Sequence, residues 1–205
     1  MRIEALSPAR RHRDCLQVTP EAGAPFLITE QELLSFDLRP GMELEEEQMT
    51  ALRQAADRSL ALRQAAALLA VRDRSRRELT DQLVRKGVSE ENAELAADRM
   101  EELGVLNDAA YAAAWVRRGV SRDWGPRRVE SELYRRGISR ELWSDALDIV
   151  EDWTAVAADF VSRRRGDLSD PAARKKLSDA LARRGFDWDC IREVLHRAEE
   201  EQKQD

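Results

Sequence analysis

Cysteine, histidine and aromatic residues are scarce in this chain of 205 residues, which has two cysteines, two histidines and 5% aromatic residues. Cys15 and Cys190 are too few and too far apart for a disulfide framework, and no Cys-x-x-Cys or His-rich spacing indicates a zinc site. We therefore expect no bound metal and a reducing, cytoplasmic location. The N-terminus lacks the apolar core of a signal peptide, and no run approaches the roughly 18 apolar residues of a membrane span.

Catalytic motifs are also missing from the sequence. His12 and His196 stand apart from any serine, cysteine or carboxylate that a recognisable motif would place for nucleophilic or metal chemistry. Both histidines are therefore expected at the surface. No glycine-rich phosphate loop of the G-x-x-x-x-G-K-S/T type is present. The sequence predicts a protein that is not an enzyme and that uses no cofactor.

Charged residues, in contrast, make up 36% of the chain, and glycine and proline number only 9 and 6. This composition is typical of long solvent-exposed helices rather than sheets, so we predict an all-α fold. The net charge of −6 argues against wholesale coating of nucleic acid, but the cations are unevenly placed. Residues 117–136 hold seven arginines against three carboxylates, a local charge of +4, and residues 163–184 hold eight cations against three carboxylates, a local charge of +5.

One segment occurs three times, at residues 77–89, 127–139 and 175–187. In each copy an apolar residue is followed four positions later by a leucine, and then by a basic pair, a glycine and an apolar residue. The copies are separated by 50 and 48 residues. A period of this size is found in arrays of helical repeats, whose units bury apolar surface mainly against their neighbours.

Each copy predicts a helix, a stop and a second helix. Apolar residues four positions apart share a helical face, and a basic pair suits the negative end of the helix dipole. A glycine can adopt the left-handed conformation that ends a helix, and the glycines at this position are Gly87, Gly137 and Gly185. A polar residue two positions later can cap the next helix, and these residues are Ser89, Ser139 and Asp187.

The chain before the repeats predicts a small extension. We expect residues 1–12 to be loose, residues 14–28 to form a short β-hairpin, and the capping box Thr29 to Glu32 to open a short helix. Residues 49–72 contain no helix breaker, so we expect one or two helices here, and the array begins within residues 52–60, either inside continuous helix or between two helices. The predicted fold is a tandem array of three three-helix repeats after an N-terminal extension. The expected bounds are 1–57 for the extension and 58–104, 105–151 and 152–205 for the repeats.

The aromatic residues are expected to pack rather than to stack on bases. Tyr111, Trp115 and Trp143 recur at helical spacing, which favours a place in the core. Trp124 follows a helix and precedes Gly125, so we expect it to be the most exposed tryptophan. Base-stacking platforms remain the alternative for these side chains.

Three segments together carry a family resemblance, at residues 67–79, 103–112 and 125–138. In this order and spacing they resemble the RecX regulatory family, over roughly residues 60–200. The resemblance implies three tandem three-helix units and a bacterial modulator of the RecA recombinase, usually an inhibitor. It implies a monomer without catalysis that lies in the groove of the RecA filament on DNA. The partners implied are therefore the RecA filament and the DNA that it carries.

The basic pairs have two interpretations. Each pair can simply stabilise a helix end, by about 0.3–1 kcal/mol. Their threefold recurrence beside further cations favours a basic stripe that follows an acidic groove or a phosphate backbone. The candidate partner- and DNA-binding residues are Arg76, Arg77, Arg85, Lys86, Arg127, Arg128, Arg135, Arg136, Arg174, Lys175, Lys176, Arg183 and Arg184.

Two classes of function therefore remain open: a regulator of a recombinase filament and a stand-alone nucleic-acid-binding helical array. The negative net charge and the lack of a base-recognising motif favour the first, because free DNA binding must overcome overall repulsion. The central unit has neighbours on both sides and is expected to be the most rigid. We therefore expect binding to depend most on Arg127, Arg128, Arg135 and Arg136.

Overall fold

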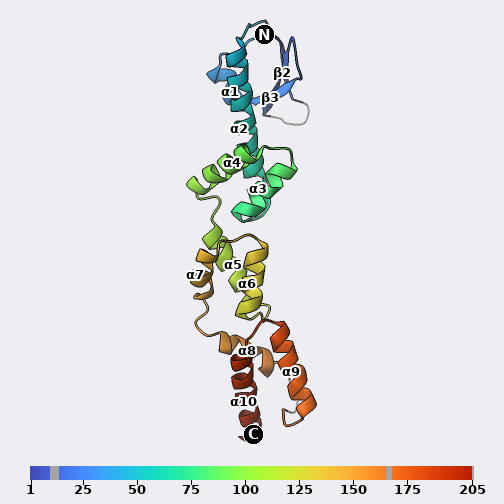
Figure 1. Cartoon of the computed structure of the whole chain (residues 1–205), viewed down its shortest axis with the longest axis vertical. Coiled ribbons are helices and arrows are strands. Elements are labelled where there is room, and N and C mark those ends of the chain that lie inside the picture. Colours follow the sequence, from blue (N-terminus) through green and yellow to red (C-terminus); the bar gives the residue numbers. More distant parts are fainter. Residues whose placement is uncertain (10–13, 165–167, 205) are drawn as a thin grey trace. The chain divides into compact units, whose positions relative to one another are not determined.

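The computed structural model describes residues 1–9, 14–164 and 168–204, and it is mainly helical (Figure 1). Three strands come first: β1 (Ile3–Pro8), β2 (Cys15–Pro20) and β3 (Phe26–Thr29). The helices that follow are α1 (Glu30–Ser35), α2 (Glu46–Val71), α3 (Arg76–Arg85), α4 (Glu90–Glu102), α5 (Asp108–Val120), α6 (Pro126–Arg135), a 3-10 turn η1 (Arg140–Leu142), α7 (Trp143–Leu147), α8 (Trp153–Ser162), α9 (Pro171–Arg183) and α10 (Trp188–Gln204).

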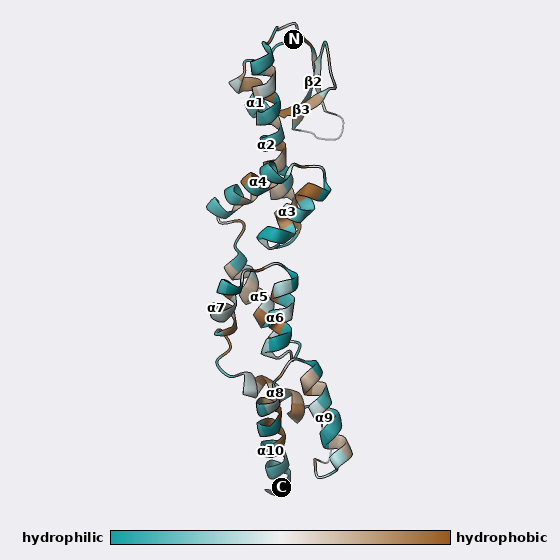
Figure 2. Cartoon of the chain, viewed as in Figure 1, coloured by the Kyte–Doolittle hydropathy of each residue, from teal (hydrophilic) through white to brown (hydrophobic). Residues whose placement is uncertain are grey.

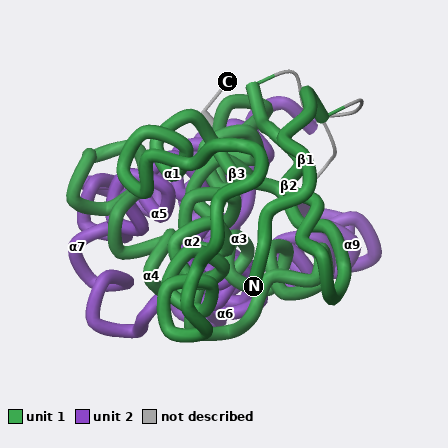
Figure 3. The backbone as a smooth tube through the Cα atoms, turned by 90° about the horizontal axis from the view of Figure 1, so that it is seen from above, with its two compact units in different colours: residues 1–74, 78–106 green, residues 75–77, 107–205 purple. Residues whose placement is uncertain are grey.

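The chain divides into two compact units (Figure 3). Unit 1 comprises Met1–Arg74 and Glu78–Leu106, and unit 2 comprises Ser75–Arg77 and Asn107–Asp205. The helices of both units carry hydrophobic and hydrophilic residues side by side (Figure 2). No helix in the described part of the chain is both long enough and apolar enough to cross a bilayer.

The N-terminal extension contains a three-stranded antiparallel sheet in the order β1-β2-β3. The predicted hairpin is present as β2 and β3, but the expectation of a loose N-terminus was wrong for residues 3–8, which form β1. Ile3 is fully buried, and its N–H donates to the carbonyl of Met42 at 2.9 Å while β1 pairs with β2. These are long-range contacts, which a polar local sequence does not reveal. The rest of the segment expected to be loose, with His12, lies outside the described residues.

Helix α2 serves two modules of unit 1. Its first part packs against the sheet through Met49, Leu52 and Ala56, which join a buried cluster with Val18 and Ile28. Its later part belongs to the first repeat, so the extension passes into the array within one continuous helix, which is the first of the two predicted arrangements. The acidic run at the start of α2 places Glu46 and Glu47 in the first helical turn, where negative charge is stabilised by the positive end of the helix dipole.

A buried carboxylate fixes the start of α1. Glu32 is 3% exposed and completes the predicted capping box, since its Oε2 accepts hydrogen bonds from Thr29 N–H at 2.8 Å and from Thr29 Oγ1 at 2.6 Å. Its Oε1 accepts a third from Ser59 Oγ of α2 at 2.5 Å. Burial alone would raise the pKa of Glu32, but the hydrogen bonds from Ser59 and Thr29 outweigh burial and lower it.

We expect Glu32→Ala to destabilise the N-terminal extension by about 2–3 kcal/mol near neutral pH, because buried donors lose a charged acceptor. A lowered native pKa means that this contribution is present above the unfolded carboxyl value, about pH 4.3, and is lost as the pH falls through the native pKa. Hydrogen exchange of β2 and β3 amides should show the loss near neutral pH, and the difference from the parent should shrink as the pH falls through the native pKa of Glu32. The exposed Glu30→Ala in the same turn is the control, and an equal effect of both substitutions would contradict the role of Glu32.

The three repeats have separate hydrophobic cores. The first is formed by the later part of α2 with α3 and α4, and its core includes Leu79, Leu83 and Met100. The second is formed by α5, α6, η1 and α7 around Val116, Val129 and Leu133. The third is formed by α8, α9 and α10 around Phe160, Leu181 and Ile191. The predicted fold of three three-helix repeats is thus confirmed, while the exact repeat bounds stay a prediction.

The three equivalent glycines end the basic helices as predicted. Gly87, Gly137 and Gly185 have φ values of 91°, 71° and 91°, in the left-handed region. Ser89 caps α4 by accepting from Asn92 N–H, and Asp187 accepts from Cys190 N–H at 2.8 Å. The second repeat differs, because Ser139 makes no side-chain cap and is followed by the turn η1 and the short helix α7.

Candidate partner and nucleic-acid interface

In unit 2, the start of α6 meets the end of α9. Gly125 N–H donates to the carbonyl of Arg184 at 2.8 Å, and Arg127 N–H donates to the carbonyl of Gly185 at 3.2 Å. The first amides of α6 and the last carbonyls of α9 have no partner within their own helices, and here they bond to one another. We call this contact the α6–α9 joint. It brings two predicted basic pairs together, Arg127–Arg128 and Arg183–Arg184, although they are far apart in the sequence.

The α6–α9 joint is closely packed. A Cβ atom built on Gly125 would lie 2.6 Å from the carbonyl carbon and oxygen of Gly185 and from the nitrogen of Phe186. A Cβ atom on Gly185 would lie 2.4 Å from the nitrogen of Arg128. Real Cβ atoms do not approach backbone so closely, so both positions require glycine if the two helix ends are to touch.

Arginine side chains at this joint stack on aromatic rings. The guanidinium carbon of Arg128 lies 4.5 Å from the ring centroid of Trp124, and that of Arg122 lies 5.5 Å from the same centroid. Arg184 and Arg164 lie 4.1 Å and 3.7 Å from the centroid of Phe160. Stacking of this kind attracts a cation to the ring and limits its motion. We define the joint cluster as the cations gathered here, namely Arg122, Arg127, Arg128, Arg164, Arg183 and Arg184.

The prediction that Trp124 is the most exposed tryptophan was wrong. Trp124 is 9% exposed, because its ring belongs to the core of the second repeat and lies against Arg122 and Arg128. The neighbouring Gly125 correctly indicated that Trp124 lies in a loop, but it did not indicate that the Trp124 side chain is buried. The expected packing of Tyr111 and Trp115 is confirmed, since their rings make an edge contact with centroids 6.3 Å apart in the same core.

Positive charge is concentrated at the joint cluster. The pKa of Arg184 is lowered first by burial and then by Arg164, with Arg128 and Arg183 adding to the repulsion and Asp123 opposing it. Asp123 itself pairs with Arg163. Across residues 14–164 and 168–204, no carboxylate forms an ion pair with any of five members of the cluster, namely Arg122, Arg127, Arg128, Arg164 and Arg183. Arginine stays charged at neutral pH, so the joint cluster attracts anions.

The end of α6 makes a related contact within unit 2. Ser75 Oγ donates to the carbonyl of Arg136 at 2.5 Å, and a Cβ atom on Gly137 would lie 2.1 Å from Cδ of Arg77. Two more of the predicted sites, Arg76–Arg77 and Arg135–Arg136, therefore lie together. Gly137 is equivalent to Gly185 in the repeat, so a glycine that ends a basic helix takes part in both contacts. We call this second contact the α3–α6 joint.

Arg136 is engaged inside the protein. Its side chain is 11% exposed, pairs with Glu132, and places its guanidinium carbon 3.3 Å from the ring centroid of Trp115. Arg135 also pairs with Glu132, at 2.6 Å, but stays 69% exposed. Burial would raise the pKa of Glu132, yet the hydrogen bonds from Arg136 and Arg135 lower it. Arg136 therefore contributes to packing in the second repeat, whereas Arg135 presents its charge to solvent.

The remaining predicted residues lie outside the two joints. Arg174, Lys175 and Lys176 are exposed at the start of α9, and Arg174 pairs with Glu199 at 2.8 Å. At 1.5 Å per residue, Lys175 is about 12 Å along the helix from Arg183. Arg85 and Lys86 are exposed at the end of α3 in unit 1, where Arg85 Nε donates to the carbonyl of Asp81 at 3.1 Å.

Several arginines at these places were not predicted as site residues. They are Arg118, which stacks on Trp115 at 4.8 Å, together with Arg122 and Arg164 of the joint cluster. A sequence signal for such residues exists, because an arginine three or four positions after an aromatic residue shares its helical face. It finds Arg118 after Trp115 and Arg164 after Phe160, whereas Arg122 has no aromatic residue three or four positions before it.

The described residues include no group of three or more histidine, cysteine, aspartate or glutamate side chains that could hold a metal ion. The structure defines a class of protein: a mainly helical repeat protein that gathers arginines where the start of one basic helix meets the end of another. This arrangement suits binding to an extended anionic surface.

Known proteins with similar sequences identify the family within this class. Models of the first, second and third three-helix domains of RecX match residues 61–100, 107–147 and 155–195. The regulatory protein RecX of Stenotrophomonas maltophilia (strain R551-3) is 40% identical over 134 residues, which span 64% of this chain and 82% of the relative. That of Xanthomonas axonopodis pv. citri (strain 306) is 38% identical over 134 residues, with 64% and 83% covered.

Solved structures agree on the fold. A crystal structure of regulatory protein RecX matches with a TM-score of 0.69 and 21% identity over 94% of this chain and 98% of the other. The structure of RecX from Lactobacillus salivarius matches with a TM-score of 0.64 and 23% identity over 70% and 97%. The chain belongs to the RecX family of regulatory proteins.

Proposed function

We propose that this protein binds the RecA recombinase filament on DNA and inhibits its ATPase and recombination activity. Membership of the RecX family supports a regulatory role of this kind. The observation that carries the proposed mode of binding is the joint cluster. A protein with a net charge of −6 approaches an anionic filament favourably only through a surface where cations outnumber carboxylates.

The proposed contact residues fall into two groups. Arg127, Arg128 and Arg183 are exposed members of the joint cluster, and Arg135 is exposed at the end of the same helix as Arg127. These four would meet the filament directly. Arg136 and Arg184 are half-buried against Trp115 and Phe160, so they would act by holding the helix ends in place.

Stand-alone nucleic-acid binding is the second candidate function, and one observation favours it. Tyr134 is 66% exposed on α6, next to Arg135. An exposed aromatic ring beside an arginine is the usual arrangement for stacking a base of a single strand while a cation meets its phosphate. This candidate requires tight binding to bare DNA.

We expect the purified protein to lower the rate of RecA ATP hydrolysis on single-stranded DNA, and to have no ATPase or nuclease activity by itself. Its affinity for the RecA filament should exceed its affinity for the same bare DNA by about tenfold or more, since the filament adds protein contacts to the phosphates. The measurements are steady-state ATPase rates against protein concentration and fluorescence anisotropy of labelled DNA with and without RecA, at several salt concentrations.

Three outcomes would contradict this proposal in different ways. Equal or tighter binding to bare DNA would favour the stand-alone function. An unchanged ATPase rate at saturating protein would remove the inhibitory role, whatever the affinity for DNA. Turnover of ATP that follows the purified protein through repurification would show that the protein is an enzyme after all.

A further inference from the structure

A groove lies between α9 and α10 in the third repeat, and none of its lining residues belongs to the joint cluster. Its volume is about 320 Å³, and Trp188, Ile191 and Leu195 of α10 form its apolar floor. Trp188 is 58% exposed, whereas Ile191 and Leu195 are 1% and 3% exposed and belong to the core of the repeat. An exposed tryptophan at the edge of a core is costly in water and is common where a partner binds.

Only cations provide the charge of this groove. Arg174 and Lys175 of α9 and Arg192 of α10 line it, and none of its lining residues is acidic. Arg174 pairs with Glu199 and Arg192 pairs with Asp189, so these two are partly neutralised. Lys175 is exposed and has no carboxylate partner in the described part of the chain.

The repeat offers an internal comparison, because a groove of the first repeat shares four equivalent lining positions with this one. Counting from Gly87 and Gly185, Thr80 corresponds to Ser178, Glu90 to Trp188 and Glu94 to Arg192. The groove of the first repeat measures about 540 Å³ and carries the acidic residues Asp81, Glu90 and Glu94.

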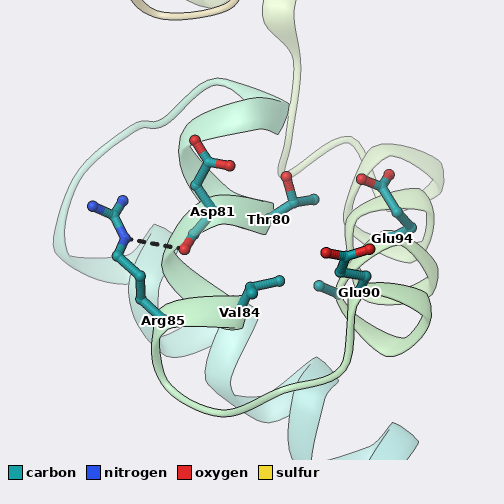
Figure 4. A pocket seen from close by; sticks show the side chains of 7 residues that line it. Thr80, Asp81, Val84, Arg85, Glu90 and Glu94 are labelled. Carbon is teal, nitrogen blue, oxygen red and sulfur yellow. Dashed lines mark hydrogen bonds between the residues drawn. The ribbon is translucent and has the colours of Figure 1, made fainter.

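Figure 4 shows Glu90 and Glu94 on α4 facing α3 across this first groove, while Arg85 turns to the carbonyl of Asp81 on the other side of α3. The fold therefore accommodates either sign of charge in the groove. The tryptophan and the arginine at positions 188 and 192 are thus not a requirement of the repeat architecture, whereas Arg174 and Lys175 have basic equivalents in the first repeat, Arg76 and Arg77.

We propose that the groove between α9 and α10 is a docking site for an acidic peptide segment that carries one apolar side chain. The apolar side chain covers Trp188 and the aliphatic floor of Ile191 and Leu195, which removes exposed apolar area from water. Flanking carboxylates lie near Lys175, Arg192 and Arg174, where their charge is complementary.

A peptide fits the groove better than a nucleic acid does. A base could stack on Trp188, but its polar edges, with their ring nitrogens and carbonyl or amino groups, would lose hydrogen bonds to water against the apolar side chains of Ile191 and Leu195. Asp189 and Glu199 do not line the groove but pair with two of its arginines, and their carboxylates repel a continuous phosphate backbone more than a peptide whose charges can be spaced. This site is separate from the joint cluster, and its test needs no RecA.

The test uses the full-length protein and a labelled synthetic peptide in which one phenylalanine is flanked on both sides by glutamates. Fluorescence anisotropy should show saturable binding to the parent. Trp188→Ala and Lys175→Glu should each weaken the affinity for the peptide by about tenfold or more. The first removes the exposed indole ring, and the second reverses the charge at position 175. Lys176→Glu is the matched control, since Lys176 is an exposed neighbour that does not line the groove, and it should change the affinity by less than about threefold.

The same measurements can overturn the proposal. A peptide with serine in place of phenylalanine, or with glutamines in place of glutamates, should lose most of its affinity; equal binding of either would contradict the assigned chemistry. Equal losses for Lys175→Glu and Lys176→Glu would mean general charge attraction rather than the groove. A single-stranded oligonucleotide that binds more tightly than the peptide, and in a way that depends on Trp188, would assign the groove to nucleic acid and refute the peptide site.

Discussion

Gly185→Ala is expected to cost about 3–5 kcal/mol of folding free energy, whereas Gly87→Ala at the equivalent position should cost only about 1–2 kcal/mol. The two glycines have the same φ of 91°, so the strain of an alanine in the left-handed region is common to both. They differ in their surroundings. A Cβ atom on Gly87 has no atom within 4 Å, whereas one on Gly185 would lie 2.4 Å from the nitrogen of Arg128.

The additional cost at Gly185 comes from the α6–α9 joint. Relief of the clash must separate the start of α6 from the end of α9. That separation weakens two hydrogen bonds, from Gly125 N–H to Arg184 and from Arg127 N–H to Gly185, each contributing about 1 kcal/mol. Urea unfolding followed by circular dichroism, with hydrogen exchange of α6 and α9 amides, would measure the effect. Equal destabilisation by the two substitutions would mean that the joint yields freely and does not fix the positions of the arginines.

Gly125→Ala provides an independent check of the same joint. Gly125 has a φ of −83°, which any residue adopts, so an alanine there carries no conformational strain. Its Cβ would still lie 2.6 Å from backbone atoms of Gly185 and Phe186. A loss of stability at this position would therefore report packing alone.

The local features of the fold could be predicted from the sequence, because they depend on residues close together in the chain. Gly87, Gly137 and Gly185 end helices where the repeated pattern placed them, and Ser89 and Asp187 cap the helices that follow. Strand β1 was missed because its stability comes from pairing with β2 and with the segment before α2. Periodicity identifies which side of a helix is buried, but it carries no information about such long-range pairing.

The candidate site followed the same rule. The basic residues were visible in the sequence, but the α6–α9 joint was not, because it joins Gly125 to Arg184 end to end rather than face to face. Sequence reasoning also treated the two members of each basic pair alike. In the second and third repeats the second member, Arg136 or Arg184, turns onto an aromatic ring, while the first stays exposed.

The first repeat has no aromatic ring, and there the second member of the basic pair is not an arginine. Residues 58–104 contain no aromatic residue, and the second member of its basic pair is a lysine, Lys86, that is exposed. Arginine is the cation that stacks well on a ring, and lysine suffices where no ring is available. The identity of the second cation thus follows the presence of a ring in its own repeat, whereas the first cation, Arg85, Arg135 or Arg183, is exposed in all three repeats.

The double substitution Arg127→Glu and Arg183→Glu should raise the concentration needed for half-inhibition of RecA ATPase by about a hundredfold, on the order of tenfold for each charge. Both side chains are exposed and unpaired with carboxylates in the described part of the chain, so the melting temperature should change by less than about 3 °C. The slope of log affinity against log salt should fall by about 2, since roughly one phosphate contact is lost for each arginine.

The matched control is the double substitution Arg99→Glu and Arg197→Glu, which changes the net charge equally. Both arginines are exposed but already pair with a carboxylate on their own helix, Glu102 or Glu193. If inhibition depends only on overall charge, both double variants will lose it alike and the salt slopes will match. If the joint cluster meets the filament, only the Arg127 and Arg183 variant will lose potency. Arg136 is left intact in both variants, because its substitution would also remove the stacking on Trp115 and so mix lost packing with lost binding. With that packing preserved, a change in potency can be assigned to charge.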